Sequence, residues 1–351
     1  MKGVVFTGHG KLELQQFADP VPGPGEVVLE MKASGMCGSD LKLLRGSPAE
    51  VAAALGVKGD GNPVIAGHEP CGVVAAIGPG VSQKQARIGM RVMQHHYDAC
   101  GVCRHCATGW TQMCVDGMTA SYGATAHGGH AQYMKCPAHT LVPLPDELSF
   151  STGAAIACGT GTAWGALKRL DLTGDETIAI FGQGPVGLSA TQLATALGAR
   201  VIALDTNEQR LERAREFGAA VSINPMTTDD VVGAIREATR GLGAHAAIDA
   251  SSSPTARRQA VQSVRTWGKV CLVGEGNELN VDVSKDILRR QVTIMGSWTF
   301  SKVGLADCAR FVADREVDVD RLFTHTWRLD QADEAYRLFD RLSDGKGVFL
   351  I

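Results

Sequence analysis

Four cysteines stand within fifteen residues of one another in the pattern C-x2-C-x2-C-x7-C: Cys100, Cys103, Cys106 and Cys114. Two-residue spacing allows successive thiolates to converge on one tetrahedral ion, with Zn–S distances near ~2.3 Å. Four thiolates complete the coordination shell, so the pattern predicts a structural zinc in a lobe spanning about residues 95–115. Free or disulfide-bonded cysteines and an iron–sulfur cluster are the alternatives, although the run lacks the Cys-Pro element of ferredoxins. His105 in the same lobe is either a competing ligand or a solvated loop residue.

A second set of metal-ligating residue types is spread along the chain. Cys37 lies in Gly-Met-Cys-Gly-Ser-Asp, His68 in Gly-His-Glu and Cys158 in Ala-Cys-Gly-Thr-Gly-Thr. Taken singly, a buried cysteine is usually a packing residue and a lone histidine is usually hydrogen-bonded structure. Taken together, they supply the Cys-His-Cys set of a catalytic zinc that keeps one position open for water or substrate. The trio therefore predicts a second metal site, with one open coordination position, in addition to the closed four-cysteine site.

A glycine-rich segment indicates a nucleotide site. It follows the apolar run 177–181, opens the helical pattern 185–197 and consists of Gly182, Gln183, Gly184, Pro185, Val186 and Gly187. Such glycines let the backbone approach a pyrophosphate, whose charge meets the N–H groups of the helix N-terminus. Pro185 suits the first helical turn, where no N–H is needed.

Asp205 ends the next predicted strand, 18 residues beyond Gly187. Its carboxylate can accept hydrogen bonds from both ribose hydroxyls and would repel a 2′-phosphate, which favours NAD over NADP. Its alternative role is that of a helix N-cap.

In the order and spacing of these motifs, the chain resembles the zinc-dependent alcohol dehydrogenases of the medium-chain dehydrogenase/reductase superfamily over nearly its whole length. The resemblance implies an α/β fold: a mostly-β GroES-like catalytic domain at 1–157 and 297–351, and a doubly wound parallel-sheet Rossmann domain at 158–296 that binds NAD. It also implies two zinc ions per chain, the catalytic one on Cys37, His68 and Cys158.

The same resemblance gives roles to the neighbours of the ligands. Asp40 would hydrogen-bond His68 and fix the imidazole tautomer. Glu69 would lie behind the zinc and coordinate it transiently during ligand exchange. Ser39 would carry the substrate proton outward. Liver-type relatives have a histidine five residues after the first ligand, where this chain has Lys42, so the proton must leave by Lys42, the cofactor ribose or water.

Further contacts follow from the resemblance. Arg210 matches the basic residue beside the adenosine ribose, or it is a surface charge at helical spacing from Arg213. Thr162 would pack on the nicotinamide, with Val273 and Gly274 near the other side of that ring. His96 falls at an aromatic wall of the substrate pocket; the alternative is that His95 and His96 hydrogen-bond their loop. The other pocket candidates, for which core packing is the alternative, are Trp110, Met118 and Trp298.

Composition limits the class of protein. A chain of 351 residues suggests two domains, and 44% hydrophobic with 20% charged residues is typical of a folded protein. A net charge of −3 without long runs of one sign argues against nucleic acid as a partner. The sequence shows neither a secretory signal nor an 18-residue apolar stretch, so we expect a cytoplasmic protein with mostly reduced thiols and no membrane helix.

The pattern of apolar and turn-forming residues changes along the chain. Residues 1–157 are punctuated by glycine and proline, with β-like runs at 26–32, 72–77 and 131–134. From about 175 to 296, short apolar runs alternate with helical stretches, which predicts βαβ units and a parallel sheet. The expected strands there are 177–181, 200–204, 246–249 and 269–273, and the expected helices are 186–197, 207–217, 228–239 and 254–266. The tail predicts helices at 305–315 and 331–343 and a strand at 347–351; residues 46–63 form a possible insertion with a short helix at 49–55.

These observations predict reversible, NAD-dependent oxidation of a primary or secondary alcohol. A Cys at position 158, where polyol dehydrogenases carry Glu, favours simple or aromatic alcohols. The alternatives are a polyol or amino-alcohol (sorbitol- or threonine-type) dehydrogenase, a zinc-free quinone or enone reductase, and a non-catalytic NAD-binding protein. The resemblance also suggests a homodimer or homotetramer joined through sheet edges of the nucleotide domain.

Overall fold

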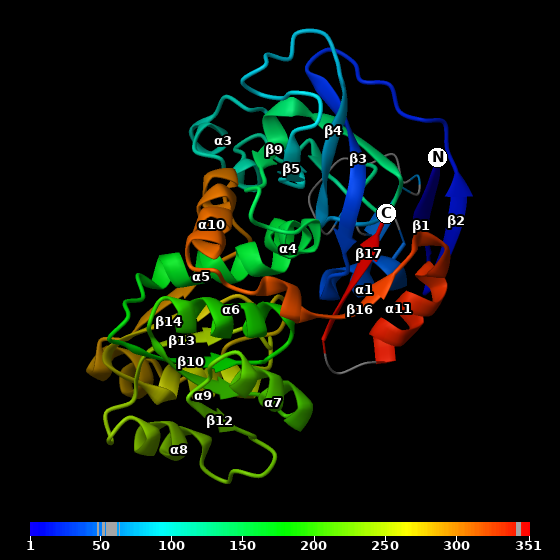
Figure 1. Ribbon diagram of the computed structural model, residues 1–351. Helices are drawn as coiled ribbons and strands as arrows, with labels where there is room; N and C mark the ends of the chain where they lie inside the picture. Colours follow the sequence, from blue (N-terminus) through cyan, green and yellow to red (C-terminus); the bar gives the residue numbers. More distant parts are fainter. Residues whose placement is uncertain (48, 51–52, 54–61, 63, 342–344) are drawn as a thin grey trace. The chain divides into compact units, whose positions relative to one another are not determined.

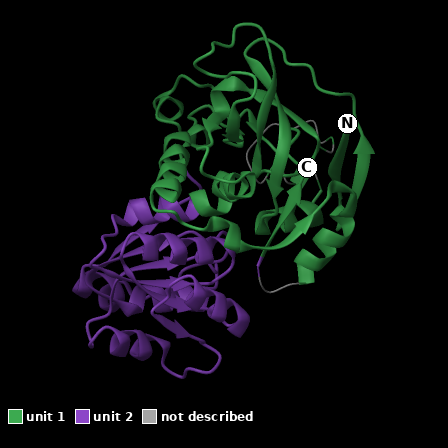
Figure 2. Ribbon diagram, in the orientation of Figure 1, with its two compact units in different colours: residues 1–161, 301–342, 346–351 green, residues 162–300, 343–345 purple. Residues whose placement is uncertain are grey.

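The structure, a computed structural model, describes residues 1–47, 49–50, 53, 62, 64–341 and 345–351. The chain forms two compact units (Figure 2): unit 1 comprises residues 1–161, 301–342 and 346–351, and unit 2 comprises residues 162–300 and 343–345. The short helix expected at 49–55 and the glycines at 59–61 lie outside the described residues, apart from positions 49, 50 and 53.

Unit 1 is built on a seven-stranded sheet (Figure 1). Its strands, in spatial order, are β16 (Phe323–Trp327), β17 (Lys346–Leu350), β3 (Glu26–Gly35), β4 (Pro70–Ile77), β5 (Arg91–Gln94) and β9 (Leu141–Pro143), with β8 (Tyr133–Pro137) also paired to β3. Only β16 and β17 run parallel; the other pairs in this sheet are antiparallel. The last strand of the chain thus lies against β3, whose end leads into the segment that carries Cys37.

Smaller elements complete unit 1. Two two-stranded sheets pair β1 (Lys2–Gly8) with β2 (Lys11–Gln16) and β6 (Tyr97–Asp98) with β7 (Ala120–Ser121). The helices are α1 (Gly38–Arg45), α3 (Arg104–Ala107), α4 (Phe150–Ala155), α10 (Lys302–Asp314) and α11 (Ala332–Arg341). Met36, Tyr336 and Phe349 share one buried apolar cluster, which joins α11 and β17 to the segment before α1.

Unit 2 is a doubly wound α/β unit. Its six strands are all parallel and lie in the order β12 (Val221–Ile223), β11 (Arg200–Leu204), β10 (Thr177–Phe181), β13 (Ala244–Asp249), β14 (Val264–Leu272) and β15 (Thr293–Gly296). The order runs outward in both directions from β10 and β13, so the topological switch point lies between these two strands. The α/β fold class predicted above is confirmed.

The helices of unit 2 connect its strands by crossovers (Figure 1). They are α6 (Pro185–Ala196), α7 (Glu208–Glu216), α8 (Val231–Ala238) and α9 (Pro254–Ser263); α5 (Gly161–Leu170) precedes the first strand. Since parallel crossovers are right-handed, a reversal of strand order at β10 places α6 and α7 on one face and α8 and α9 on the other. Buried aliphatic residues such as Ile202, Val261 and Val270 form the core.

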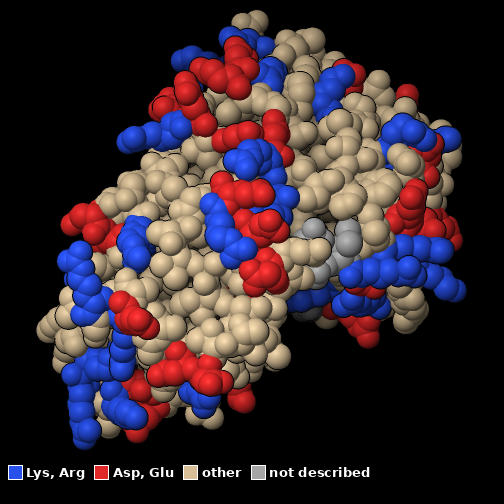
Figure 3. Space-filling model, turned by 60° about the horizontal axis from the view of Figure 1, so that its bottom comes forward, with Lys and Arg blue, Asp and Glu red and all other residues tan. Residues whose placement is uncertain are grey.

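Lys, Arg, Asp and Glu side chains are intermixed on the face drawn in Figure 3, in keeping with the small net charge of −3. Among the described residues, no helix combines the length and the apolar character that crossing a bilayer requires.

Candidate metal centres and dinucleotide site

The four-cysteine lobe brings its thiols together. The sulfurs of Cys100, Cys103, Cys106 and Cys114 lie within 4.8 Å of one another. The Sγ–Sγ distance is 3.8 Å for Cys100 and Cys106 and 3.9 Å for Cys103 and Cys114. Tetrahedral zinc with Zn–S near ~2.3 Å places its sulfurs roughly 3.8 Å apart, so the residues fit a closed zinc site.

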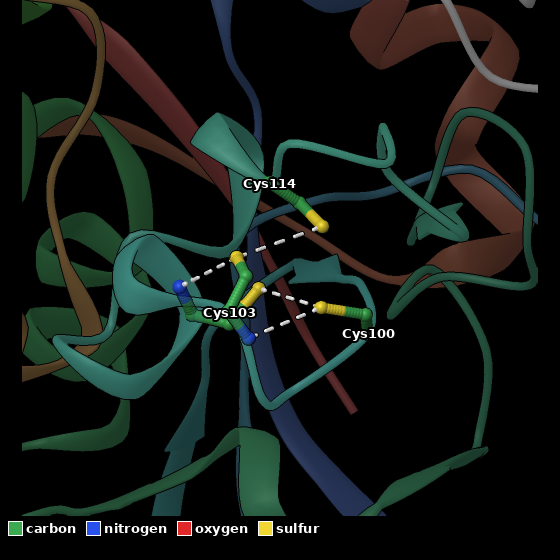
Figure 4. Close-up of side chains that lie close together, drawn as sticks. Cys100, Cys103 and Cys114 are labelled. Carbon is green, nitrogen blue, oxygen red and sulfur yellow. Dashed lines mark hydrogen bonds between the residues drawn. The ribbon is translucent and has the colours of Figure 1, made fainter.

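Local backbone geometry shapes this lobe. Cys103 is the N-cap of α3, and its sulfur accepts the N–H of Cys106, while the sulfur of Cys100 accepts the N–H of Cys103. Figure 4 shows the sulfurs of Cys100, Cys103 and Cys114 pointing toward one another. Backbone N–H groups of Cys106 and Val115 lower the pKa of Cys103 to about 6, which favours the thiolate that a metal needs.

The second group of ligand types also converges, although its members are far apart in the sequence. One ligand atom each from Cys37, His68, Glu69 and Cys158 lies within 4.8 Å of the others. The sulfurs of Cys37 and Cys158 are 4.0 Å apart, close to the separation expected on one tetrahedral ion. Two sulfurs and one imidazole fit a zinc that keeps a position for an exchangeable ligand.

Two features of the local backbone present these cysteines. Cys37 is the N-cap of α1, and its own N–H is bound by Asp40 in the first turn. Cys158 lies in a π-helical turn, Ile156–Thr160, that joins α4 to α5. Such turns often interrupt helices at functional sites, and here the turn carries a ligand.

Asp40 and Ser39 flank the imidazole of His68 on opposite sides. Oδ1 of Asp40 lies 2.9 Å from Nδ1 of His68, and Oγ of Ser39 lies 3.2 Å from Nε2. A carboxylate beside Nδ1 keeps the proton on that nitrogen and leaves the lone pair of Nε2 available to a metal.

The pKa values in this cluster are strongly shifted. The hydrogen bond between the two thiols lowers the pKa of Cys37 well below its usual value and raises that of Cys158. Burial favours neutral His68, but Asp40 and Cys37 raise its pKa well above the usual value. A compact set of mutually shifted groups is typical of a functional site.

Glu69 is fully buried and paired with Lys346. Nζ of Lys346 lies 2.8 Å from Oε1 and 2.6 Å from Oε2 of Glu69, and it also donates to the carbonyl of Met36 at 2.9 Å. Burial raises the pKa of Glu69, whereas the charge of Lys346 lowers it and favours the ionised pair. A Cβ at Gly35 would stand 1.9 Å from Oε2, so only glycine there admits this carboxylate.

The predicted pocket residues have different surroundings. His96 is buried, with its ring edge-on to that of His68 at 5.2 Å between centroids, and burial lowers its pKa well below the usual value. Trp110 lies in the cysteine lobe and Met118 follows the lobe in the sequence; both are half-buried. Trp298 belongs to unit 2, where its Nε1 donates to Glu275 at 2.7 Å. A place for these residues in a substrate pocket stays a prediction.

The glycine-rich turn lies at the carboxyl end of β10, at the switch point of the sheet. Gly182 has φ +89°, and a Cβ at Gly187 would lie 1.7 Å from the carbonyl oxygen of Gly182. Gly184 is the N-cap of α6 and faces open space, while Pro185 and Val186 begin the helix. Ligands of open α/β sheets bind in the crevice at this edge, and open backbone at Gly184 suits a pyrophosphate.

Asp205 follows β11 and lies against the glycine turn. Its Oδ2 accepts the N–H of Gln183 at 2.6 Å, and its Oδ1 accepts the N–H of Asn207 at 2.9 Å. Asn207, and not Asp205, is the N-cap of α7, because its side chain accepts the N–H of Arg210. Arg210 forms an ion pair with Asp205 at 3.6 Å, so both predicted ribose-site residues lie together.

Two further predicted cofactor contacts lie at element ends in unit 2. Thr162 is buried in the first turn of α5. Val273 follows β14, and its N–H and that of Gly274 both donate to the carbonyl of Asp249. Arg257 bridges this region by donating to Asp249 and to the carbonyl of Gly274.

The sequence interpretation missed several residues that the fold brings to the ligands. They are Ser34, His130, Tyr336 and Lys346, all at most 2% exposed. None belongs to a spacing pattern; a lysine and a tyrosine inside the apolar patterns of the tail were the available signals.

Unit 1 is mostly β and carries a closed and an open set of metal ligands, and unit 2 is doubly wound and carries the glycine turn. Together these features define a metal-dependent dehydrogenase that uses a dinucleotide. Comparison with known proteins agrees. Residues 23–146 match the family described as "Alcohol dehydrogenase GroES-like domain", and residues 185–314 match "Zinc-binding dehydrogenase".

Relatives match over nearly the whole chain. An uncharacterized zinc-type alcohol dehydrogenase-like protein, YphC of Escherichia coli K12, is 36% identical over 99% of this chain and 98% of its own length. An alcohol dehydrogenase of Geobacillus stearothermophilus is 32% identical over 99% and 97% of the two chains. An L-threonine 3-dehydrogenase of Symbiobacterium thermophilum is 29% identical over 96% and 93%.

Solved structures show the same fold. The alcohol dehydrogenase TADH from Thermus sp. ATN1 has a TM-score of 0.89 and 26% identity, covering 100% of this chain and 99% of its own. RspB from E. coli CFT073, described as an alcohol dehydrogenase in complex with NADH, has a TM-score of 0.87 and 25% identity at the same coverage. A 2R,3R-butanediol dehydrogenase from Bacillus subtilis has a TM-score of 0.87 and 27% identity, again at that coverage. The chain therefore belongs to the zinc-type alcohol dehydrogenases and is an NAD-dependent oxidoreductase of that family.

Proposed function

We propose that the protein oxidises a primary or secondary alcohol with NAD, reversibly, at the site formed by Cys37, His68 and Cys158. The observation that carries this proposal is the convergence of two sulfurs and one imidazole, with a serine hydroxyl 3.2 Å from that imidazole. A zinc ion held there supplies a Lewis acid that makes a substrate hydroxyl more acidic.

The residues of the chain would divide the remaining work. Asp40 orients His68 from Nδ1, and Ser39 accepts the substrate proton at Oγ and passes it outward. Lys42, which follows Ser39 on α1 and is exposed, is one exit for that proton. Lys346 balances the charge of Glu69 behind the ligands, so that carboxylate adds no net charge while paired. Thr162 and Val273 are the proposed neighbours of the nicotinamide, which would supply the hydride acceptor.

On the dinucleotide side, we propose that the turn 182–187 holds the pyrophosphate and Asp205 the ribose hydroxyls. The carboxylate of Asp205 already accepts two backbone N–H groups, yet a carboxylate offers about four acceptor positions, so ribose hydroxyls can be added. Arg210 beside it is proposed to face the adenosine ribose.

A direct test is a panel of alcohols with NAD, following the absorbance of the reduced cofactor, combined with zinc analysis. We expect two zinc ions per chain in the unaltered protein. Cys37→Ala should reduce this to one and abolish turnover, while the control Cys308→Ala, a buried cysteine in α10 outside both ligand sets, should keep both. An active Cys37→Ala protein without zinc at this site would contradict the proposal.

A second candidate function is oxidation of a polyol or amino-alcohol, favoured by two observations. Buried His96 beside His68 would give the substrate pocket a polar wall, and relatives include proteins named for threonine and butanediol. Including L-threonine, sorbitol and 2,3-butanediol in the panel separates the two functions, since a simple-alcohol enzyme should turn over 1-butanol or benzyl alcohol with the higher kcat/KM.

We also propose a homo-oligomer in the cytoplasm. β15 is an edge strand of the six-stranded sheet, and Val283 and Leu288, in the segment that precedes β15 in the sequence, are exposed apolar residues that a second copy could cover. All ten cysteines are free thiols, which suits a reducing compartment. Light scattering of the purified protein would measure the oligomeric state.

A further inference from the structure

A line of buried polar side chains runs from the ligand His68 into the interior of unit 1. Asp40 contacts His68, as described above, and Oδ2 of Asp40 accepts the hydroxyl of Tyr336 at 3.0 Å. The Tyr336 hydroxyl lies 2.7 Å from Nε2 of His130, whose Nδ1 lies 2.7 Å from Oγ of Ser34. We call Asp40, Tyr336, His130 and Ser34 the Asp40 network.

These side chains come from distant parts of the chain. Ser34 lies on β3, His130 precedes β8, and Tyr336 lies on α11. Each of the four residues is at most 1% exposed. Since a buried polar group without a partner lowers stability, every donor in this network must meet an acceptor.

Donor and acceptor chemistry fixes the direction of each hydrogen bond. A phenol has one proton, and Tyr336 gives it to Asp40, so its oxygen must accept the proton on Nε2 of His130. Burial lowers the pKa of His130 to about 4, so the ring is neutral and its Nδ1 is an acceptor. Ser34 therefore donates to Nδ1, and all the bonds point toward Asp40.

At its other end, the Asp40 network determines how the Asp40 carboxylate faces the metal ligand His68. Oδ2 of Asp40 also accepts the N–H of Cys37 at 2.8 Å, so one carboxylate oxygen receives two donors and is held in place. Oδ1 then faces Nδ1 of His68 at 2.9 Å, which requires a proton on Nδ1. The remaining nitrogen, Nε2, lies 3.2 Å from Oγ of Ser39 and, when unprotonated, offers a lone pair to a metal held by Cys37 and Cys158.

Packing locks the intermediate members. A Cβ at Gly67, which has φ +92° and precedes the ligand, would stand 2.4 Å from Nδ1 of His130, so the ring lies directly against that backbone. Tyr336 packs edge-on against Phe6 at 5.0 Å between centroids, and His130 against Phe349 at 4.7 Å. Neither ring can turn without moving its neighbours.

We propose that Tyr336 is a positioning residue for the metal ligand His68, acting through Asp40, and that His130 and Ser34 fix the direction in which its hydroxyl donates. This inference rests on the metal site of the proposed function. In chemical terms, the hydrogen bond donated by the Tyr336 hydroxyl holds the Asp40 carboxylate in one orientation. That orientation sets the tautomer and the angle of the His68 imidazole.

Tyr336→Phe removes the hydroxyl and keeps the ring. Partners of a ligating histidine typically contribute 10–100-fold to metal affinity, so we expect roughly tenfold faster loss of one zinc per chain to a chelator. The zinc of the four-cysteine lobe should leave at an unchanged rate, which provides a control within the same molecule. Tyr122→Phe removes another buried phenol hydroxyl from unit 1 and should change neither rate.

Substitution of His130 tests the direction of the network. Glutamine retains an N–H near the position of Nε2, whereas asparagine is too short to supply it. His130→Gln should therefore retain zinc within about threefold of the unaltered protein, and His130→Asn should resemble Tyr336→Phe. In cobalt-substituted protein, Tyr336→Phe should also shift the visible d–d bands of the open site.

The outcomes separate the two claims. If the unaltered protein binds a single zinc, in its four-cysteine lobe, the proposed metal site fails. If it binds two, and Tyr336→Phe lowers only the thermal midpoint without changing zinc loss or the cobalt spectrum, the residue is merely structural and the inference is overturned.

Discussion

The ammonium group of Lys346 and the carboxylate of Glu69 form an ion pair that is shielded from solvent, with Nζ 2.6 Å from Oε2 and side-chain exposures of 2% and 0%. The two residues belong to β17 and to the segment after His68, so the pair ties the C-terminal strand to the back of the candidate metal centre. Removing one partner of a buried pair leaves an uncompensated charge.

Lys346→Met should lower the free energy of unfolding by about 3 kcal/mol, because Glu69 would remain buried without its cation. Urea titration measures this change. Adding Glu69→Gln should recover much of the loss, and Lys135→Met, which removes the cation of the half-exposed pair with Glu26, should change stability by less than about 1 kcal/mol. Equal effects of Lys346→Met and Lys135→Met would contradict the importance of burial.

Asp205→Asn tests the choice of dinucleotide. The substitution keeps one oxygen that can accept a backbone N–H, replaces the other oxygen by a donor, and removes the charge that would repel a 2′-phosphate. We expect the ratio of kcat/KM for NAD to that for NADP to fall by about tenfold or more, since a hydrogen bond to a charged group contributes about 1.5–3 kcal/mol. Asp175→Asn, at an exposed turn, is the control. An unchanged ratio would show that Asp205 does not discriminate between the two.

Cys106→Ser tests the closed site. It should release one zinc and lower the free energy of unfolding by about 3 kcal/mol or more, because a tightly bound ligand stabilises only the folded state. Zinc at the open site should be retained after gentle purification. Metal analysis with calorimetry makes the measurement, and a variant that keeps two zinc ions and full stability would exclude Cys106 as a ligand.

The pH dependence of stability should carry a contribution from His130. Burial holds its pKa at about 4, against an ordinary value of 6.5, so the unfolded chain binds the proton more readily. The contribution is fully present above about pH 6.5 and is lost as pH falls toward 4, a total of about 3 kcal/mol.

His130→Gln has no titrating ring at this position. Between pH 6.5 and 4, unfolding free energies of this variant should therefore fall less steeply than those of the unaltered protein. Parallel slopes would mean that the pKa of His130 is not lowered in the folded protein.

The types of the metal ligands could be predicted from the sequence because they depend on residue types at short spacing. The cysteine pattern and the glycine turn are local, and strands 177–181 and 200–204 occur at the predicted residues. The fold class followed from the alternation of apolar runs with helical stretches. The set of Cys37, His68 and Cys158 was predicted from residue types, and the resemblance to a family supported it because no short spacing links the three residues.

Other features depend on tertiary context. The sequence predicts a helix over 254–266, but the observed helix α9 ends at Ser263. It ends there because the β-branched residues Val264 and Thr266 begin strand β14 without an intervening turn. Helix 228–239 begins later, at Val231, where the side chain of Asp230 caps it. β15 was missed because four residues give little periodic signal.

The buried partners of Asp40 and Glu69 could not be predicted from the sequence for a different reason. Tyr336 and Asp40 are separated by 296 residues in the sequence, and Lys346 and Glu69 by 277. No spacing pattern links such residues, since only the packing of α11 and β17 against the first segment brings them together.

That packing has a consequence for biosynthesis. Every thiol and imidazole of the open site has left the ribosome once residue 158 has emerged, but the hydroxyl and ammonium groups that support Asp40 and Glu69 belong to Tyr336 and Lys346, which are translated much later. A nascent chain halted before residue 336 carries both carboxylates without these partners. The centre therefore reaches its mature form only after the entire intervening nucleotide-binding unit has been made.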